Sequence, residues 1–172
     1  MRVTRERAAA NRQKILDAAG TLFRQHGFDG IGVADIMKRA GLTHGGFASV
    51  PGNDSWIEKV AGSARPTFEA VVRGYLSPRH RDDPGHGCLF AALGSDVVRQ
   101  PRTVRRAFTE GLRSRVDGLG KLLQGRSAAA RREKALATMA GLVGALMLAR
   151  AVDDSKLSDE ILKAGAATFG RS

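Results

Sequence analysis

The sequence predicts an all-α protein, and two observations carry that prediction. Hydrophobic residues make up 42% of the 172 residues, whereas aromatic residues make up only 5%, which favours aliphatic packing between helices. Apolar residues recur at helical spacing along most of the chain, and no segment alternates as a half-buried strand would. A chain of this length forms one domain, or a small module joined to a larger one.

The first predicted helix spans residues 11–26. Its apolar residues recur at the i, i+1, i+4, i+7 and i+8 positions of one stripe, namely Ile15, Leu16, Ala19, Leu22 and Phe23. Gly27 follows as a stop, and a second short helix is predicted over residues 33–40, ended by Gly41. Thr43 can cap a third short helix through its hydroxyl. The result is a long helix followed by a helix, a glycine-containing turn and another helix.

The rest of the chain is also predicted to be helical, with interruptions. A turn at residues 50–53 precedes a short helix that carries Trp56, Ile57 and Val60, and residues 61–66 break it. Helical spacing returns over residues 68–76. Residues 77–87 are polar and contain two prolines, which predicts an exposed loop. Four further helices are predicted at about residues 88–99, 101–123, 128–152 and 158–169.

Residues 135–149 carry no charged side chain. This stretch is shorter than the roughly 20 residues that cross a bilayer, so a membrane span is the weaker interpretation. A helix that is apolar on all sides is normally buried all round, and Gly141, Gly144 and Ala145 let another helix approach closely. We expect the same helix of a second copy as the partner. A central core helix within one subunit is the alternative.

The formal net charge of +11 favours a polyanionic partner, either nucleic acid or an anionic membrane surface. A helix, a glycine-containing turn and a second helix form the helix-turn-helix pattern, whose second helix enters the major groove of DNA. Ahead of it, only Glu6 opposes five cations: Arg2, Arg5, Arg7, Arg12 and Lys14. A disordered basic arm in this place can lie along phosphates, and a solvated tail is the alternative.

Several other classes of protein are disfavoured. One cysteine forms no intramolecular disulfide, and the N-terminus lacks an apolar signal segment, so we expect a cytoplasmic protein. The segment from His80 to Cys88 contains possible metal ligands, but their spacing fits no zinc pattern. The sequence contains no nucleophile elbow, P-loop, dinucleotide fingerprint or paired carboxylates. We therefore expect no catalytic residue, no metal and no cofactor.

The first 47 residues resemble the N-terminal DNA-binding domain of TetR-family transcriptional regulators. The resemblance rests on ILDAA at 15–19, GFDG at 27–30, VADI at 33–36 and AGLTHGGF at 40–47. Residues 74–88, with Leu93 and Gly94, resemble more loosely the ligand-binding domain of one TetR subgroup. The resemblance implies a helix-turn-helix DNA-binding domain over residues 1–52, with a basic arm at 1–10. Residues 53–172 then form a helical domain for ligand binding and dimerisation.

The family pattern implies which residues bind DNA: Arg5, Arg7, Arg12, Thr43, His44, Gly45 and Asn53. Thr43 can hold a phosphate at a helix N-terminus, His44 can hydrogen-bond a base or phosphate, and Gly45 permits close approach. Residues 48–54 depart from the pattern, because an aromatic phosphate contact is missing and Asn53 stands where the family has a lysine. Fewer phosphate contacts predict weaker DNA binding. The segment between Phe47 and Tyr75 is also shorter than the pattern, through a deletion or an omitted piece near residues 61–66.

The resemblance also implies a ligand pocket and a dimer interface. The candidate pocket residues are Phe68, Val72, Tyr75, Leu89, Leu93, Phe108 and Leu112, and the candidate dimer residues are Leu136, Met139, Val143, Met147, Ile161 and Leu162. The implied function is a repressor that binds a palindromic operator in double-stranded DNA as a homodimer and leaves it when a small-molecule inducer binds. The alternatives are a TetR-like dimer with impaired DNA binding and a basic protein of anionic membrane surfaces.

Overall fold

The computed structural model describes residues 5–28, 31, 33–41, 56–62, 66–125 and 127–170, and every regular element in those residues is helical. This confirms the predicted all-α class. The elements are α1 (Arg5–His26), α2 (Val33–Ala40), α3 (Trp56–Ala61), α4 (Phe68–Tyr75), α5 (Pro78–Asp82), the 3-10 helix η1 (Pro84–His86), α6 (Leu89–Val97), α7 (Arg102–Leu122), α8 (Ala128–Ala151) and α9 (Ser155–Phe169).

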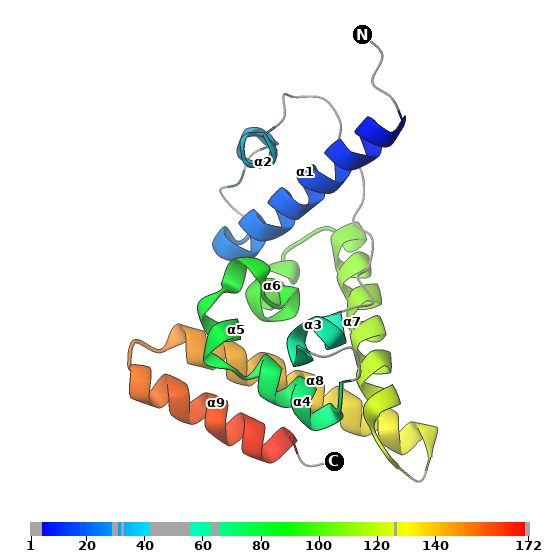
Figure 1. Ribbon diagram of the computed structural model, residues 1–172, viewed down its shortest axis with the longest axis vertical. Coiled ribbons are helices and arrows are strands. Elements are labelled where there is room, and N and C mark those ends of the chain that lie inside the picture. Colours follow the sequence, from blue (N-terminus) through cyan, green and yellow to red (C-terminus); the bar gives the residue numbers. More distant parts are fainter. Residues whose placement is uncertain are drawn as a thin grey trace.

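The helices form two layers (Figure 1). Helices α1 and α2 pair in one layer, and the body beneath them consists of α3 to α9, with α8 and α9 packed along one another at the far side. Helix α7 packs on α8 along the side of the body, whereas α6 and η1 lie between the two layers and contact α1. The α1 and α2 pair is therefore held on the body through α6 and η1.

Each layer has its own hydrophobic core. The smaller core joins Ile15, Ala18 and Ala19 of α1 to Ile36 of α2. The larger core fills the body, and the side chains that it buries almost completely include Val71, Val72, Tyr75, Val116, Leu119, Leu142 and Leu146. Complete burial of one aliphatic side chain contributes about 1.5–3 kcal/mol. The two cores lie on either side of residue 53, where we propose the domain boundary.

Helix α2 has the predicted bounds, but α1 begins earlier than predicted. It starts at Arg5, so residues 5–10 are helical rather than a disordered arm. The run of three alanines at 8–10 has the highest helix propensity and extends the helix beyond its apolar stripe. Helix α9 likewise starts at Ser155 rather than 158, because the Asp154 carboxylate accepts hydrogen bonds from the backbone N–H groups of Lys156 (2.8 Å) and Leu157 (3.2 Å).

The predicted loop at residues 77–87 is wrong, because the segment contains α5 and η1. Ser77 Oγ accepts a hydrogen bond from the His80 N–H (3.2 Å), and Asp83 Oδ1 accepts one from the His86 N–H (3.3 Å). A proline follows each of these two caps, at a position where its missing N–H costs no intrahelical hydrogen bond. The prolines that predicted a loop therefore start two short helices.

Helix α8 is a central helix of the body with one free side. Its inward residues are Ala135, Thr138, Met139, Leu142, Leu146 and Ala149. On other sides, Leu136 is 46% exposed and Leu148 is 59% exposed, so the helix is not buried all round. By length and composition alone, α8 could cross a membrane, and 33% of its apolar window is buried within the protein. Its packing against α6, α7 and α9 is that of a core helix.

Candidate nucleic-acid interface

The paired helices α1 and α2 form the first part of a helix-turn-helix. Ile36 of α2 is 2% exposed and packs on the small residues of α1. Gly27 ends α1 with a φ of 75°, and its N–H donates to the Phe23 carbonyl (2.9 Å). Gly41 ends α2 in the same way, with a φ of 66°. Glycine adopts this left-handed conformation without the steric cost that other residues meet, so each helix ends sharply.

A shallow groove of about 260 Å³ runs between α1 and α2. Lys14 and Arg39 supply cations to its lining, and Asp17 supplies the one carboxylate there among the residues that the structure describes. Arg39 and the neighbouring Lys38 are exposed at the end of α2. Such cations suit a helix that crosses a phosphate backbone. The sequence analysis did not single out Lys38 or Arg39, although two adjacent basic residues after the buried Ile36 were a visible signal.

The predicted DNA-binding residues fall into two groups. Arg5 and Arg7 belong to the first turn of α1, and Arg12 is half-buried on the same helix. Thr43, His44, Gly45 and Asn53 lie outside the described residues, as does the predicted third helix. Of the predicted DNA-binding domain, the structure therefore describes α1, with which the domain begins, and α2, which precedes the turn.

Helix α1 is joined to the body by a hydrogen bond between residues far apart in the sequence. Arg24 Nε donates to the Gly85 carbonyl in η1 at 2.7 Å, and burial lowers the pKa of this arginine. A methyl group on Gly85 would lie only 2.8 Å from Gln25 Nε2, so η1 rests directly on α1. At the end of α1, a methyl group on Gly27 would lie 2.7 Å from the Asp96 carboxylate of α6. Glycine at both positions is what permits this close packing.

Behind η1, a histidine links three segments of backbone. His80 Nδ1 lies 2.7 Å from the Tyr75 carbonyl, and His80 Nε2 lies 3.0 Å from the Cys88 N–H. The first contact requires a proton on Nδ1 and the second requires a lone pair on Nε2, so the ring is neutral. Burial lowers the pKa of His80, and the Arg150 guanidinium lowers it further. Arg150 itself donates to the His80 carbonyl (2.6 Å) and to the Arg81 carbonyl (3.0 Å).

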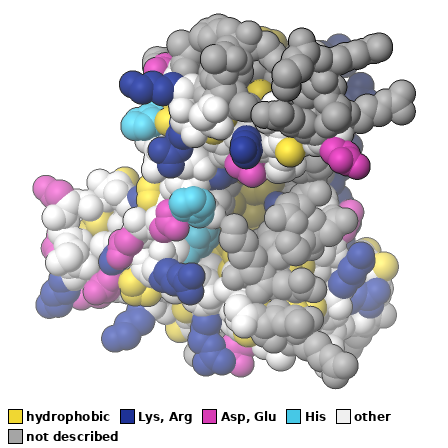
Figure 2. Space-filling view, turned by 45° about the horizontal axis from the view of Figure 1, so that its top comes forward, with side chains coloured by type: hydrophobic (Ala, Val, Ile, Leu, Met, Phe, Trp, Pro, Cys, Tyr) yellow, Lys and Arg dark blue, Asp and Glu magenta, His cyan; other side chains and the backbone are white. Residues whose placement is uncertain are grey.

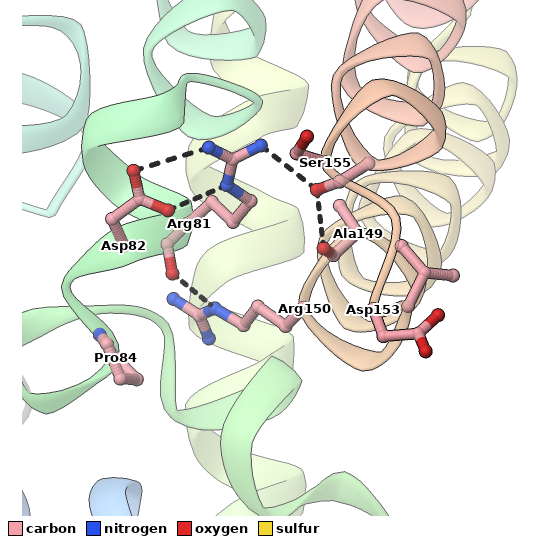
Figure 3. Close-up of a pocket in the computed structure, with 9 residues that line it drawn as sticks. Arg81, Asp82, Pro84, Ala149, Arg150, Asp153 and Ser155 are labelled. Carbon is pink, nitrogen blue, oxygen red and sulfur yellow. Dashed lines mark hydrogen bonds and ion pairs between the residues drawn. The ribbon is translucent and has the colours of Figure 1, made fainter.

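A larger groove of about 540 Å³ lies where α5, α8 and α9 meet (Figure 3). Arg81 projects across it and donates to Asp82 (2.7 Å), Ser158 (2.9 Å) and Asp159 (2.6 Å). The hydrogen bond from Arg81 lowers the pKa of the Asp82 carboxyl. Each guanidinium nitrogen of Arg81 already has an acceptor, so this hydrogen-bond network links α5 to α9 rather than offering a free cation to a ligand.

Five of the seven candidate pocket residues, all except Leu89 and Leu93, lie in or against the packed core of the body. The seven come from α4, α6 and α7, and Phe68, Val72, Tyr75 and Leu93 are all at most 3% exposed. Phe108 and Leu112 are half-buried against the same core, and Leu89 is 36% exposed. The Phe90 and Phe108 rings meet edge to face with centroids 4.8 Å apart. Neither of the two grooves described above is lined by these residues.

The candidate dimer residues divide between the two sides of α8 and α9. Met139 (2% exposed) and Leu162 (3% exposed) face the core of their own protomer. A second copy cannot contact them, so the prediction that they form the dimer interface is wrong. Val143, Met147 and Ile161 are half-buried at the edge of that core, and Leu136 is exposed. Leu148 and Leu157, which the sequence analysis did not select, are exposed leucines on these two helices.

Comparison with known proteins bears on the α1 and α2 pair. Residues 15–48 match the model of the family described as bacterial regulatory proteins, tetR family. No curated protein matches the chain. The match covers α1 from Ile15 onward, all of α2 and the residues up to Ala48, and this family consists of regulators rather than enzymes. The matched segment and its paired helices support a DNA-binding transcriptional regulator of the TetR family, and the match does not extend to the body.

Proposed function

We propose that this regulator is a repressor that binds a palindromic operator as a homodimer and is released by a small-molecule ligand. The observation that carries the proposal is the direct connection between the DNA-binding helices and the body. Arg24 of α1 is hydrogen-bonded to η1, and η1 immediately precedes α6 of the body. A change in the body therefore has a short physical route to the DNA-binding helices.

The dimer is supported by an apolar stripe that the other described helices leave exposed or only half-buried. On α8 the stripe contains Leu136, Ala140, Gly144 and Leu148, and on α9 it contains Leu157, Ile161 and Ala164. A methyl group on Gly144 would meet nothing within 4 Å, so the backbone of α8 is open to a close approach there. Because α8 and α9 pack on one another, two copies can bury both stripes in a four-helix arrangement with two-fold symmetry.

Two-fold symmetry sets how the dimer reads DNA. It places two recognition segments about 34–36 Å apart, one turn of the duplex, which requires a palindromic site. We propose that Thr43, His44 and Gly45 meet the major groove. The cations of α1 and α2 then hold the phosphates, and these are Arg5, Arg7, Arg12, Lys14, Lys38 and Arg39.

Ligand release follows from the position of α6. The candidate pocket residues pack between α4, α6 and α7, so a ligand gains room there by moving α6 relative to α4. Because α6 and η1 contact α1, that movement changes the distance between the two recognition segments of a dimer. The ligand then shifts the population toward a conformation with lower operator affinity.

An electrophoretic shift experiment tests the proposal, with the DNA upstream of the protein's own gene as the probe. The triple variant Arg12→Ala, Thr43→Ala, His44→Ala should lose operator affinity while sedimentation shows an intact dimer. Lys163→Ala, an exposed cation on the outer side of α9, serves as the control and should bind as the parent does. Unchanged affinity of the triple variant contradicts the placement of the interface. An intact dimer that shifts no duplex supports instead a TetR-like protein with impaired DNA binding.

A further inference from the structure

Helix α7 carries a surface that the operator-binding motif does not explain. Residues 99–114 contain five arginines and one acidic residue, Glu110. All five arginines are exposed, and they are Arg99, Arg102, Arg105, Arg106 and Arg113. We name this set the α7 arginine face. It holds a large part of the net charge of +11, and it lies in the body rather than in the α1 and α2 pair.

The ion pairs of this surface leave most of its charge uncompensated. Arg99 pairs with Asp96 (2.8 Å), and Arg106 pairs with Glu110 (3.0 Å). Both pairs join residues three or four positions apart. The Arg106 pair is exposed on both sides, whereas Arg99 is 65% exposed and its partner Asp96 is 24% exposed. Such surface pairs contribute little, and their arginines can exchange the partner for another anion. Arg102, Arg105 and Arg113 have no ion pair within the part of the chain that the structure describes. These three guanidinium groups can therefore bind an external anion without breaking an ion pair of the described residues.

The arginine side chains of α7 are spaced so that they can contact a row of phosphates. At 100° per residue, Arg102, Arg105, Arg106 and Arg113 fall within about a third of the helix circumference. From Arg102 to Arg113 the helix rises about 17 Å at about 1.5 Å per residue. One strand of a DNA duplex presents a phosphate about every 3.4 Å along its axis, so this length of helix faces about five phosphates. Arginine also binds phosphate through two parallel hydrogen bonds, which lysine does not.

The residues that lie between the arginines indicate which class of polyanion fits this face. The exposed residues among them are Pro101, Thr103, Ala107, Thr109, Glu110 and Ser114, and Val98, next to Arg99, is the large exposed apolar residue beside the face, so the face has no row of large apolar side chains to enter a membrane. Its phenylalanine, Phe108, is half-buried against the core and stacks edge to face on Phe90. Single-stranded nucleic acid is typically held on exposed aromatic rings, which this face lacks. Cations without stacking or apolar groups fit the phosphates of duplex DNA.

The position of the face is consistent with a DNA partner. Helix α7 begins five residues after the end of α6, and Asp96 of α6 lies against Gly27 at the end of α1. The end of α7 that starts at Arg102 therefore lies toward the DNA-binding layer, and the helix runs away from it (Figure 1). Figure 2 shows Lys and Arg side chains protruding on the right-hand side of the molecule, where Figure 1 draws α7 and the beginning of α8.

We propose that the α7 arginine face is a second, sequence-independent binding surface for the phosphates of duplex DNA. It holds DNA next to the operator or DNA of any sequence, while the helix-turn-helix supplies base recognition. The α7 surface thus adds affinity and salt dependence without adding specificity.

The test measures binding of a labelled duplex of scrambled sequence to the full-length protein between 50 and 200 mM salt by fluorescence anisotropy. The variant Arg102→Gln, Arg105→Gln, Arg113→Gln should flatten the slope of log K against log salt by about 2.7, which is about 0.9 for each phosphate contact. The matched control Arg73→Gln, Lys156→Gln, Lys163→Gln removes the same charge from exposed sites on α4 and α9, and its slope should stay close to that of the parent. The conservative variant Arg102→Lys, Arg105→Lys, Arg113→Lys should keep most of the slope.

Equal slopes for the glutamine variant and the matched control overturn the proposal, because total charge rather than the α7 face then governs binding. Preferred binding of the parent to phosphatidylserine vesicles or to single-stranded DNA, lost in the glutamine variant, overturns it as well. The same substitutions in a Thr43→Ala, His44→Ala background separate this surface from the operator site. There the change in slope should persist, although operator recognition is already impaired. Thermal unfolding of each variant verifies that the exposed substitutions leave the fold intact.

Discussion

The protonation state of His80 determines which hydrogen bonds its ring can make to the backbone of Tyr75 and Cys88. Tyr75, Arg150, Asp83 and Cys88 surround its ring. Protonation of Nε2 would set two N–H donors against each other, since the Cys88 N–H already points at that nitrogen. This repulsion would destabilise the segment that leads into α6. The segment follows η1, whose Gly85 carbonyl accepts the hydrogen bond from Arg24.

We therefore expect the stability of the protein to fall in mild acid. The pKa of His80 is lowered in the folded protein, so below the ordinary histidine pKa of about 6.5 the unfolded chain binds more protons than the folded one. By linkage, the free energy of unfolding decreases as the pH falls below about 6.5, until the folded protein also takes up the proton. Urea unfolding between pH 5 and 7.5 measures the effect.

The control for this pH dependence is His86, whose side chain is 64% exposed. His80→Gln should lower the free energy of unfolding at pH 7.5 and flatten its decline toward pH 5, whereas His86→Gln should leave the decline in place. A decline of the same steepness in the parent and in His80→Gln would assign the pH dependence to another group.

At the scale of the elements, α8 has two apolar sides with different roles. Leu146 is fully buried and belongs to the core of the protomer, whereas Leu148, two residues later, is 59% exposed on the proposed dimer stripe. A charge introduced at these two positions should therefore have different effects. The inner side contributes to folding, and the outer side contributes to association.

We expect Leu148→Glu to yield a folded monomer, because a carboxylate buried between two copies meets its symmetry mate without a partner. Sedimentation velocity measures the oligomeric state, and circular dichroism verifies the helical content. The matched control is Val98→Glu, the same change from apolar to acidic at a residue that is 70% exposed at the end of α6. The control should remain a dimer. A dimeric Leu148→Glu protein would exclude this stripe as the interface.

At the scale of the whole molecule, the small α1 and α2 unit depends on its contacts with the body. Among the residues that the structure describes, its core contains four buried residues, and the α1 contacts with η1 and α6 add to what holds it in place. The Arg24 hydrogen bond to Gly85 joins residues 61 positions apart and is a direct polar link between α1 and η1. Helix α1 should open separately from the body when this link is lost.

Arg24→Met keeps the aliphatic stem and removes the donor, so it tests this link. A hydrogen bond from a charged group contributes about 1.5–3 kcal/mol, so amide hydrogen exchange in α1 should accelerate about tenfold or more while exchange in α8 stays unchanged. Arg73→Met is the control, because its ion pair with Glu69 (3.2 Å) is exposed on α4 and contributes little. Equal protection of α1 in both variants would show that Arg24 does not hold the two layers together.

Much of the fold could be predicted from local sequence. The spacing of Ile36 and Ala40 with the stop at Gly41 gave α2 its bounds, because helix periodicity and glycine caps act within a few residues. The loop predicted at residues 77–87 from its prolines is wrong. There Ser77 and Asp83 act as caps, and a proline just after a cap favours the start of a helix.

The all-α class, the helix-turn-helix segment and the apolar character of α8 could be predicted from the sequence, since each depends on residue types at short spacing. Which apolar side of α8 and α9 is covered depends on packing: Met139 and Leu162 turn inward, whereas Leu136 and Leu148 stay exposed. Packing also brings Arg24 to Gly85 and places five of the seven candidate pocket residues in or against a core. The physical reason is that periodicity fixes the faces of a helix, whereas the neighbours that cover a face come from distant parts of the chain.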